Sequence, residues 1–182
     1  LLVIDARAAA AWAGSGVDGA HPDFQRAMDV DEGPIDVDGH RGQIVQVGDC
    51  GSAQVWAVDG GIALFEHRAS GHATSMSKAA LKKALGERVT SFPVRELQVL
   101  GELELTSGCL ALMLPYMAGD VGAAAIRAGS KKPKNVENGR LLLPLPNGIY
   151  RIERYRFALE PGHEDELGTY GDALRIVRAN PS

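Results

Sequence analysis

Short apolar or alternating runs recur along the whole chain and predict β-strands. Successive side chains of a strand point to opposite faces, so a strand with one buried face carries an apolar residue at every second position. Residues 97–105 show this alternation, whereas residues 1–4 and 110–114 are apolar throughout, which is typical of buried strands. The same reasoning predicts further strands at residues 42–48, 54–58, 62–67, 140–146, 149–160 and 173–178.

Glycine-containing turns separate these runs. The chain holds 22 glycines, many of them beside Asp, Asn or Ser, and such pairs mark tight turns. Asp59-Gly60 is a strong hairpin signal, because a type I′ turn needs positive φ at both central residues. We therefore expect a three-stranded meander over residues 42–67 and a further hairpin around residues 146–148.

Helical patterns are fewer than strand patterns. Residues 77–85 carry two leucines four apart on one face, with lysines elsewhere and a glycine after them, which predicts the clearest helix. Asp5 can cap a short helix over residues 6–13, and a proline can open another over residues 22–28. A small-residue segment, 120–129, is a further short helix candidate.

These elements predict an α+β fold made mostly of antiparallel β-strands, arranged as sheets or as a sandwich. One clear helix is expected near residues 75–86 and one or two short helices near the N-terminus. We expect residues 1–182 to form a single globular unit, with an alternative of two lobes, 1–74 and 89–182, joined by the helix. The polar residues 130–139 are expected to form a flexible loop.

Composition indicates an ordinary soluble protein. Of the 182 residues, 45% are hydrophobic and 23% are charged, and no apolar run is long enough to span a bilayer. The chain begins without a basic leader, so we expect no secretory signal. Cys50 and Cys109 do not make a disulfide framework, and we interpret them as reduced thiols in the cytoplasm. A single bridge between them is the alternative.

The charges are distributed unevenly along the chain. Residues 1–66 hold 11 acidic and 3 basic residues, a balance of −8, and residues 67–182 hold 12 acidic and 16 basic, a balance of +4. The resulting net charge of −4 argues against a general nucleic-acid binder. Five acids fall within ten residues, and they are the candidate contacts to a basic partner: Asp29, Asp31, Glu32, Asp36 and Asp38. A solvated acidic loop is the plainer alternative, and the spacing does not fit an EF-hand calcium loop.

No catalytic or cofactor motif is present in the sequence. Glu66, His67 and His72 lie close together, but their spacing fits no standard zinc pattern, so we expect neither a metal nor another cofactor. Cys50 follows an aspartate in a turn without a nucleophile signature, and Cys109 has the surroundings of a small core residue. The basic run 131–134 fits a solvated loop, and both tryptophans fit a core.

Two segments resemble known bacterial families. Residues 1–65 resemble the immunity protein 21 group of bacterial polymorphic toxin systems, through Trp12, Gly14, Asp23, Phe24, Arg26, Ala27 and Asp29. Residues 101–178 are similar to a bacterial domain of unknown function found near toxin loci, through Ser107, Gly108, Pro146, Gly148 and Tyr150. An aspartate-proline pair of that second pattern is replaced here by Leu114-Pro115.

The resemblance implies a non-catalytic protein that binds and masks a cognate toxin. The acidic first 66 residues would then meet a basic toxin surface, with charge complementarity that speeds encounter. Two alternatives stay open at this stage. One is a small-molecule-binding or regulatory domain with a pocket between two β-lobes. The other is an enzyme of unrecognised type that uses His67, His72, Asp49 or Cys50.

Overall fold

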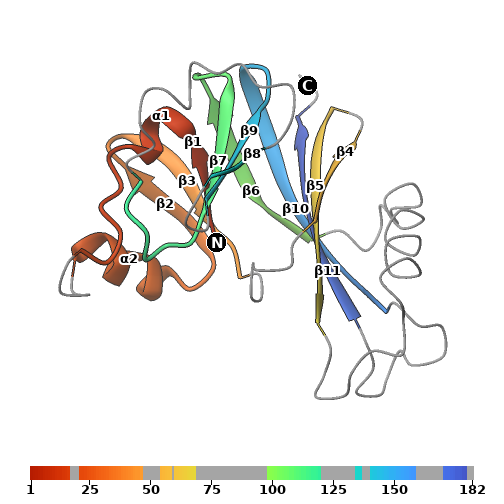
Figure 1. The fold of residues 1–182 in the computed structure, drawn as a ribbon, viewed down its shortest axis with the longest axis horizontal. Helices are drawn as coiled ribbons and strands as arrows, with labels where there is room; N and C mark the ends of the chain where they lie inside the picture. The colour runs from red at the N-terminus through yellow and green to blue at the C-terminus, as the bar shows by residue number, and fades with distance from the viewer. Residues whose placement is uncertain are drawn as a thin grey trace. The chain divides into compact units, whose positions relative to one another are not determined.

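A computed structural model describes residues 1–16, 21–46, 54–58, 60–68, 98–119, 134–136, 140–158 and 170–179 of the chain. The described residues form mostly antiparallel β-sheet with two helices, which confirms the predicted β-rich α+β class (Figure 1). The predicted helix near residues 75–86 and the segment 120–129 lie outside the described residues.

The elements follow one another in the order β1 (Leu2–Asp5), α1 (Ala6–Ala9), α2 (Pro22–Val30), β2 (Gly33–Val37), β3 (His40–Ile44), β4 (Gln54–Val58), β5 (Gly61–Arg68), β6 (Gln98–Leu105), β7 (Cys109–Met113), β8 (Lys134–Val136), β9 (Arg140–Pro144), β10 (Gly148–Ala158) and β11 (Tyr170–Arg178). The short helix predicted over residues 6–13 ends earlier, at Ala9, and the helix predicted over residues 22–28 continues to Val30.

Six of the strands form a sheet in the order β2-β3-β1-β7-β9-β8, and its central strands are the two apolar runs of the sequence. β1 pairs antiparallel with β7, so that Leu2 lies opposite Met113 and Asp5 opposite Leu110. Every residue of β1 and β7 is buried, as the continuous apolar runs predict for strands covered on both faces. One exception to apolar packing is Gln43 of β3, which is fully buried and whose Oε1 has no hydrogen-bond partner.

Both helices cover one face of this six-stranded sheet. Apolar side chains of β1, β2, β3, β7 and β9 alternate onto that face and form one core cluster with small residues of α1 and Ala27 of α2. Trp12, which follows α1, is buried in the same cluster, as the sequence predicts. Alanine suits these helix positions because it lets the helices approach the sheet closely. Only a small part of the surface of α2 therefore packs against the core.

The other five strands form a second sheet in the order β4-β5-β11-β10-β6. β5 pairs antiparallel with β11 over eight residue pairs, from Tyr170 opposite Arg68 to Val177 opposite Gly61. β4 and β5 form the hairpin that the Asp59-Gly60 signal predicts, with Val58 opposite Gly61. In β10, Ile152 and the following Glu153 are both buried, so the alternation of buried and exposed side chains changes phase close to Arg154.

The chain divides into two compact units that are each discontinuous in sequence. Unit 1 contains Leu1–Gln46, Leu100–Arg151 and Arg178–Ser182, and unit 2 contains Val47–Val99 and Ile152–Val177. This grouping differs from two successive lobes at residues 1–74 and 89–182, because strands from the second half of the chain return to each unit.

Three local predictions were wrong. The meander over residues 42–67 is not formed, because β3 belongs to the six-stranded sheet and β4 and β5 to the other. For the same reason β9 and β10 do not form a hairpin around residues 146–148, since the chain passes from one sheet to the other there. Residues 134–136 of the expected loop form β8, which pairs with β9. Sequence alternation marks a strand, but it does not say which sheet the strand joins.

Candidate protein-binding surface

The five clustered acids of the sequence occupy the end of α2 and the β2–β3 hairpin, and together they are called the acidic surface below. Asp29 lies in the last turn of α2, Asp31 and Glu32 connect α2 to β2, Asp36 lies in β2, and Asp38 lies in the hairpin turn. Four of these residues are exposed and Glu32 is half-buried. The cluster of five acids in the sequence is therefore carried by a helix end followed by a two-stranded hairpin.

The hairpin is built around an Asp-Gly turn. Asp38 and Gly39 have φ angles of 54° and 76°, and the strands leave the turn with Val37 opposite His40. Positive φ at both central residues is the signature of a type I′ turn, which matches the twist of the flanking strands. The Asp36 carboxylate accepts a hydrogen bond from the Gly39 backbone N–H at 3.1 Å, so this acid also stabilises the turn.

Two further carboxylates tie the end of α2 to the chain after β3. The Gln46 backbone N–H donates to Glu32 Oε1 at 3.2 Å, and the Gln46 side-chain amide donates to Asp31 Oδ1. Asp29 and Asp38 differ from these three acids. Their carboxylates make no hydrogen bond or ion pair with any residue that the structure describes. The acidic surface thus combines acids with a local structural role and acids without one.

Arg26 connects α2 to the hairpin. Its guanidinium donates to Asp23 Oδ1 at 2.6 Å and to the Asp36 backbone carbonyl at 3.0 Å, and it lies over the Trp12 ring at 5.9 Å. β2 is an edge strand of its sheet, and Pro34 lacks a backbone N–H. Arg26 and Pro34 therefore reduce the number of free backbone groups along this edge, which protects it from pairing with a further strand.

Asp23 orients the start of α2. Its Oδ2 accepts a hydrogen bond from the Ala13 backbone N–H at 2.9 Å, and His21 Nδ1 accepts one from the Asp23 backbone N–H at 3.2 Å. Partial burial raises the pKa of the Asp23 carboxyl, but the hydrogen bonds from Ala13 and Arg26 and the positive charge of Arg26 outweigh it, so the pKa lies below its ordinary value. Asp23 is therefore a charged anchor between α2 and the segment after α1.

The segment after α1 packs backbone to backbone against the segment after β7. Gly14 has a φ of 65°, and a Cβ there would collide with the backbone of Met117. A Cβ on Gly119 would collide with the carbonyl oxygen of Ala9, and the Gly119 N–H donates to the Trp12 carbonyl. Only glycine permits both approaches. The Trp-Ala-Gly sequence at residues 12–14 thus has a structural explanation.

The residues that carry the second resemblance also meet in space. The Tyr150 hydroxyl donates to the Pro146 carbonyl at 2.8 Å, and the Leu145 backbone N–H donates to the Gly108 carbonyl at 3.2 Å. Burial raises the pKa of the Tyr150 hydroxyl, which therefore stays a neutral donor. Among the matching residues described above, those other than Asp29 hold turns and segments of the chain together.

Asp5 joins two distant parts of unit 1. Its carboxylate is buried and accepts hydrogen bonds from the backbone N–H groups of Arg7, Thr106 and Ser107, at 2.8, 2.7 and 2.9 Å. Burial raises the pKa of the Asp5 carboxyl, but the hydrogen bonds from these backbone N–H groups lower it by more. The pKa therefore lies below its ordinary value. Capping of α1 by Asp5 follows the sequence prediction. The contacts with Thr106 and Ser107 are 101 and 102 residues distant in sequence, so no local signal predicts them.

The other candidate residues give no assembled site among the described residues. Cys109 carries a free, buried thiol, as predicted for a small core residue, and burial together with the negative charge of Asp5 raises its pKa. His67 lies in β5, while Asp49, Cys50 and His72 lie outside the described residues. In the described ranges, no three His, Cys, Asp or Glu side chains gather in an arrangement that could hold a metal ion.

Neither described helix has the length and apolar character needed to cross a membrane.

Comparison of the chain with protein-family models, with curated proteins and with solved structures found no match.

Proposed function

We propose that this chain is a non-catalytic binding protein of the immunity type, which neutralises a basic toxin protein by masking it. The observation that carries the proposal is the acidic surface on α2 and the β2–β3 hairpin. Residues 21–46 hold six acidic and two basic residues, a local balance of −4. Exposed charges of one sign attract a partner of the opposite sign and orient it before contact.

Folding alone does not account for this charge. Asp29 lies in the last turn of α2, where the helix dipole favours basic residues, and that turn contains none. Asp38 occupies a turn position that uncharged Asn fills at least as well. Both side chains are exposed and unpaired among the described residues, so neither carboxylate contributes a hydrogen bond or an ion pair to the fold. Binding to a basic surface supplies a reason for both.

The acidic surface is also held in one conformation before any partner arrives. Arg26 fastens α2 to β2, Asp36 fastens the hairpin turn, and Glu32 and Asp31 fasten the helix end to Gln46. A surface that is already ordered loses less conformational entropy on binding, which favours high affinity. Tight, inhibitory binding of one toxin benefits from this property.

The proposal places the protein in the cytoplasm, beside the toxin that it inhibits. Its test is co-expression with the protein encoded by the gene next to that of this chain, which the proposal expects to be the toxin. We expect that protein to arrest growth when it is expressed alone, and we expect this chain to abolish the arrest. We also expect the two proteins to co-elute from a size-exclusion column as one complex. Separate elution at micromolar concentration, with growth arrest unchanged, contradicts the proposal.

A further inference from the structure

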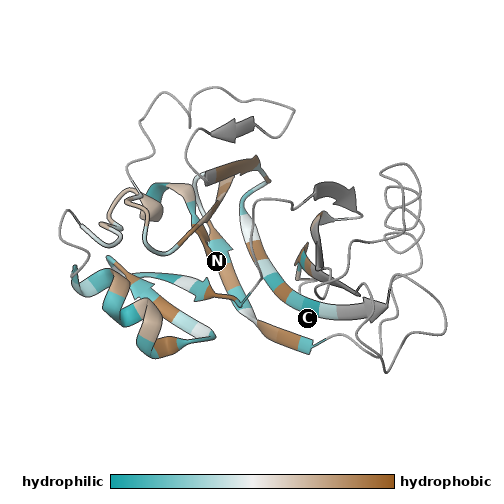
Figure 2. Ribbon diagram, turned by 60° about the horizontal axis from the view of Figure 1, so that its bottom comes forward, coloured by the Kyte–Doolittle hydropathy of each residue, from teal (hydrophilic) through white to brown (hydrophobic). Residues whose placement is uncertain are grey.

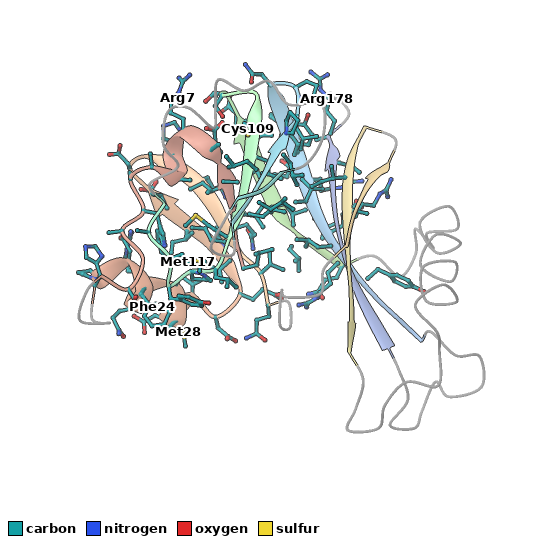
Figure 3. All side chains as sticks on the ribbon, viewed as in Figure 1. Arg7, Phe24, Met28, Cys109, Met117 and Arg178 are labelled. Carbon is teal, nitrogen blue, oxygen red and sulfur yellow. The ribbon has the colours of Figure 1, made fainter. Side chains whose placement is uncertain are left out.

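Among the side chains that the structure describes, the most exposed large apolar one lies on the same helix as part of the acidic surface. Met28 of α2 has 61% of its area exposed, compared with 57% for Val99, 52% for Ile149 and 48% for Tyr116. Phe24 lies one turn earlier on the same flank of the helix and is half-buried (Figure 3). α2 therefore presents an apolar pair to solvent, although its own core contact is Ala27.

Packing within unit 1 does not require Met28 to be apolar. Ala27 is the buried residue of α2, and Val30 is the partly buried residue of α2 that packs against the core cluster. A single exposed apolar residue is common on protein surfaces and by itself indicates nothing. Here, however, it lies beside Asp29 on a helix whose other exposed residues, apart from Pro22 at its start, are polar or charged (Figure 2).

The two flanks of α2 differ in chemistry. Successive residues of a helix are about 100° apart, which puts Met28 and Arg26 on opposite flanks and Asp29 between them on the outer face. Arg26 faces the hairpin that carries Asp36 and Asp38. A helix is about 10 Å across, and a protein interface covers about 800 Å² on each partner. One partner lying across α2 can therefore contact the apolar flank of the helix and the acidic surface together.

We infer that Met28 is the apolar anchor of the toxin interface, and that the partner presents an apolar contact bordered by Lys or Arg side chains. This inference rests on the proposed function and adds the point at which the complex is held. Interfaces typically combine a few buried apolar or aromatic anchors with a charged border, and methionine adapts well to a partner's shape. In such an arrangement the charges govern the association rate and the anchor governs the dissociation rate.

The test compares Met28→Ser with Ile149→Ser, which makes the same kind of change at another exposed apolar residue of unit 1. Binding to the purified product of the neighbouring gene is followed by surface plasmon resonance. We expect M28S to raise the dissociation rate by roughly tenfold or more with little change in association, and I149S to leave both rates unchanged. Met28→Leu should restore slow dissociation, and the melting temperatures of all variants should match, because both side chains are exposed.

The outcomes separate the two proposals. If the wild-type chain binds but M28S dissociates no faster than I149S, the anchor is elsewhere and the inference is wrong while the proposed function stands. If the wild-type chain does not bind the neighbouring protein at all, the proposed function fails, and the inference fails with it.

Discussion

At the scale of single residues, buried or half-buried carboxylates act as connectors in unit 1. Asp5 and Asp23 each accept hydrogen bonds from backbone N–H groups of a separate segment, and the pKa of each carboxyl is lowered. A charged acceptor forms stronger hydrogen bonds than a neutral one, so these acids can join segments with a single side chain. Acids with such connections have a structural reason to be present, which Asp29 and Asp38 lack.

Replacing Asp5 should destabilise unit 1 markedly. Asp5→Ala removes the acceptor for three backbone N–H groups, and we expect the free energy of unfolding to fall by about 2 to 4 kcal/mol. Asp5→Asn keeps one acceptor oxygen but turns an N–H₂ group toward donors, so it should destabilise nearly as much. Urea denaturation followed by circular dichroism measures both changes.

The same carboxylate predicts a pH dependence. A group whose pKa is lowered on folding stabilises the folded state above its unfolded pKa of about 3.9, and this stabilisation is lost as the pH falls through the folded pKa. The difference in stability between the wild type and D5N should therefore shrink below about pH 4. A difference that stays constant down to pH 2 would show that the Asp5 charge does not contribute to stability.

At the scale of elements, α2 and the β2–β3 hairpin behave as one supported surface. α2 has one buried residue, so its position depends on Arg26 and Asp23 as well as on Ala27. The planar guanidinium can donate to Asp23 and to the Asp36 carbonyl at the same time, which the single ammonium of lysine cannot reproduce. Arg26 is thus the link between helix and hairpin.

Arg26→Lys should therefore weaken the fold nearly as much as Arg26→Ala. We expect each to lower the free energy of unfolding by about 1 kcal/mol, a modest value because the side chain is largely solvent-exposed. Arg41→Ala is the matched control, since Arg41 is exposed on β3 and makes no polar contact within the described residues. Wild-type stability in R26K would mean that charge alone, without the forked geometry, holds α2.

Some elements of the fold carry a clear signal in the sequence and others do not. β1 and β7 were predictable because apolar runs mark buried strands, and the Asp-Gly pair at residues 59–60 correctly predicted the β4–β5 hairpin. β2 was missed because it begins with a glycine and a proline, which leaves only two alternating apolar positions, Ile35 and Val37. Yet the same Asp-Gly signal stands at residues 38–39, and it could have revealed this hairpin.

Long-range pairing lay beyond sequence reasoning. Leu2 pairs with Ile44 and with Met113, and nothing local at any of these positions specifies the others. The acidic surface was recognised as a cluster of charges, but its division into structural and unpaired acids depends on partners such as Gln46 and Gly39. Met28 gave no signal, because exposure of a helix residue depends on which face the sheet covers.

At the scale of the whole molecule, charge is the property that most restricts the choice of partner. The net charge is −4, while the first 66 residues alone carry a balance of −8, so the negative charge is concentrated in one part of the chain. At physiological salt, charges act over about 8 Å, which is enough to steer a protein that is already close. A basic protein would approach the acidic surface faster than a neutral one, and salt would reduce the advantage.

The central claim is that the acidic surface steers a basic partner. Asp29→Asn and Asp38→Asn together remove two charges from that surface without removing any hydrogen bond seen among the described residues, and Asn-Gly also suits the type I′ turn. Glu102→Gln with Glu104→Gln removes two exposed charges from β6 and is the matched control. Both double variants have the same net charge, so only the location of the lost charge differs.

The most direct measurement is the association rate with the neighbouring gene product at low and high salt, by stopped-flow fluorescence. We expect D29N/D38N to associate several-fold more slowly at low salt and to depend less on salt, with a smaller change in dissociation, while E102Q/E104Q stays close to the wild type. Equal association rates and equal salt dependence for the wild type and both double variants would contradict the account, because the acidic surface would then be solvated charge without a role in binding.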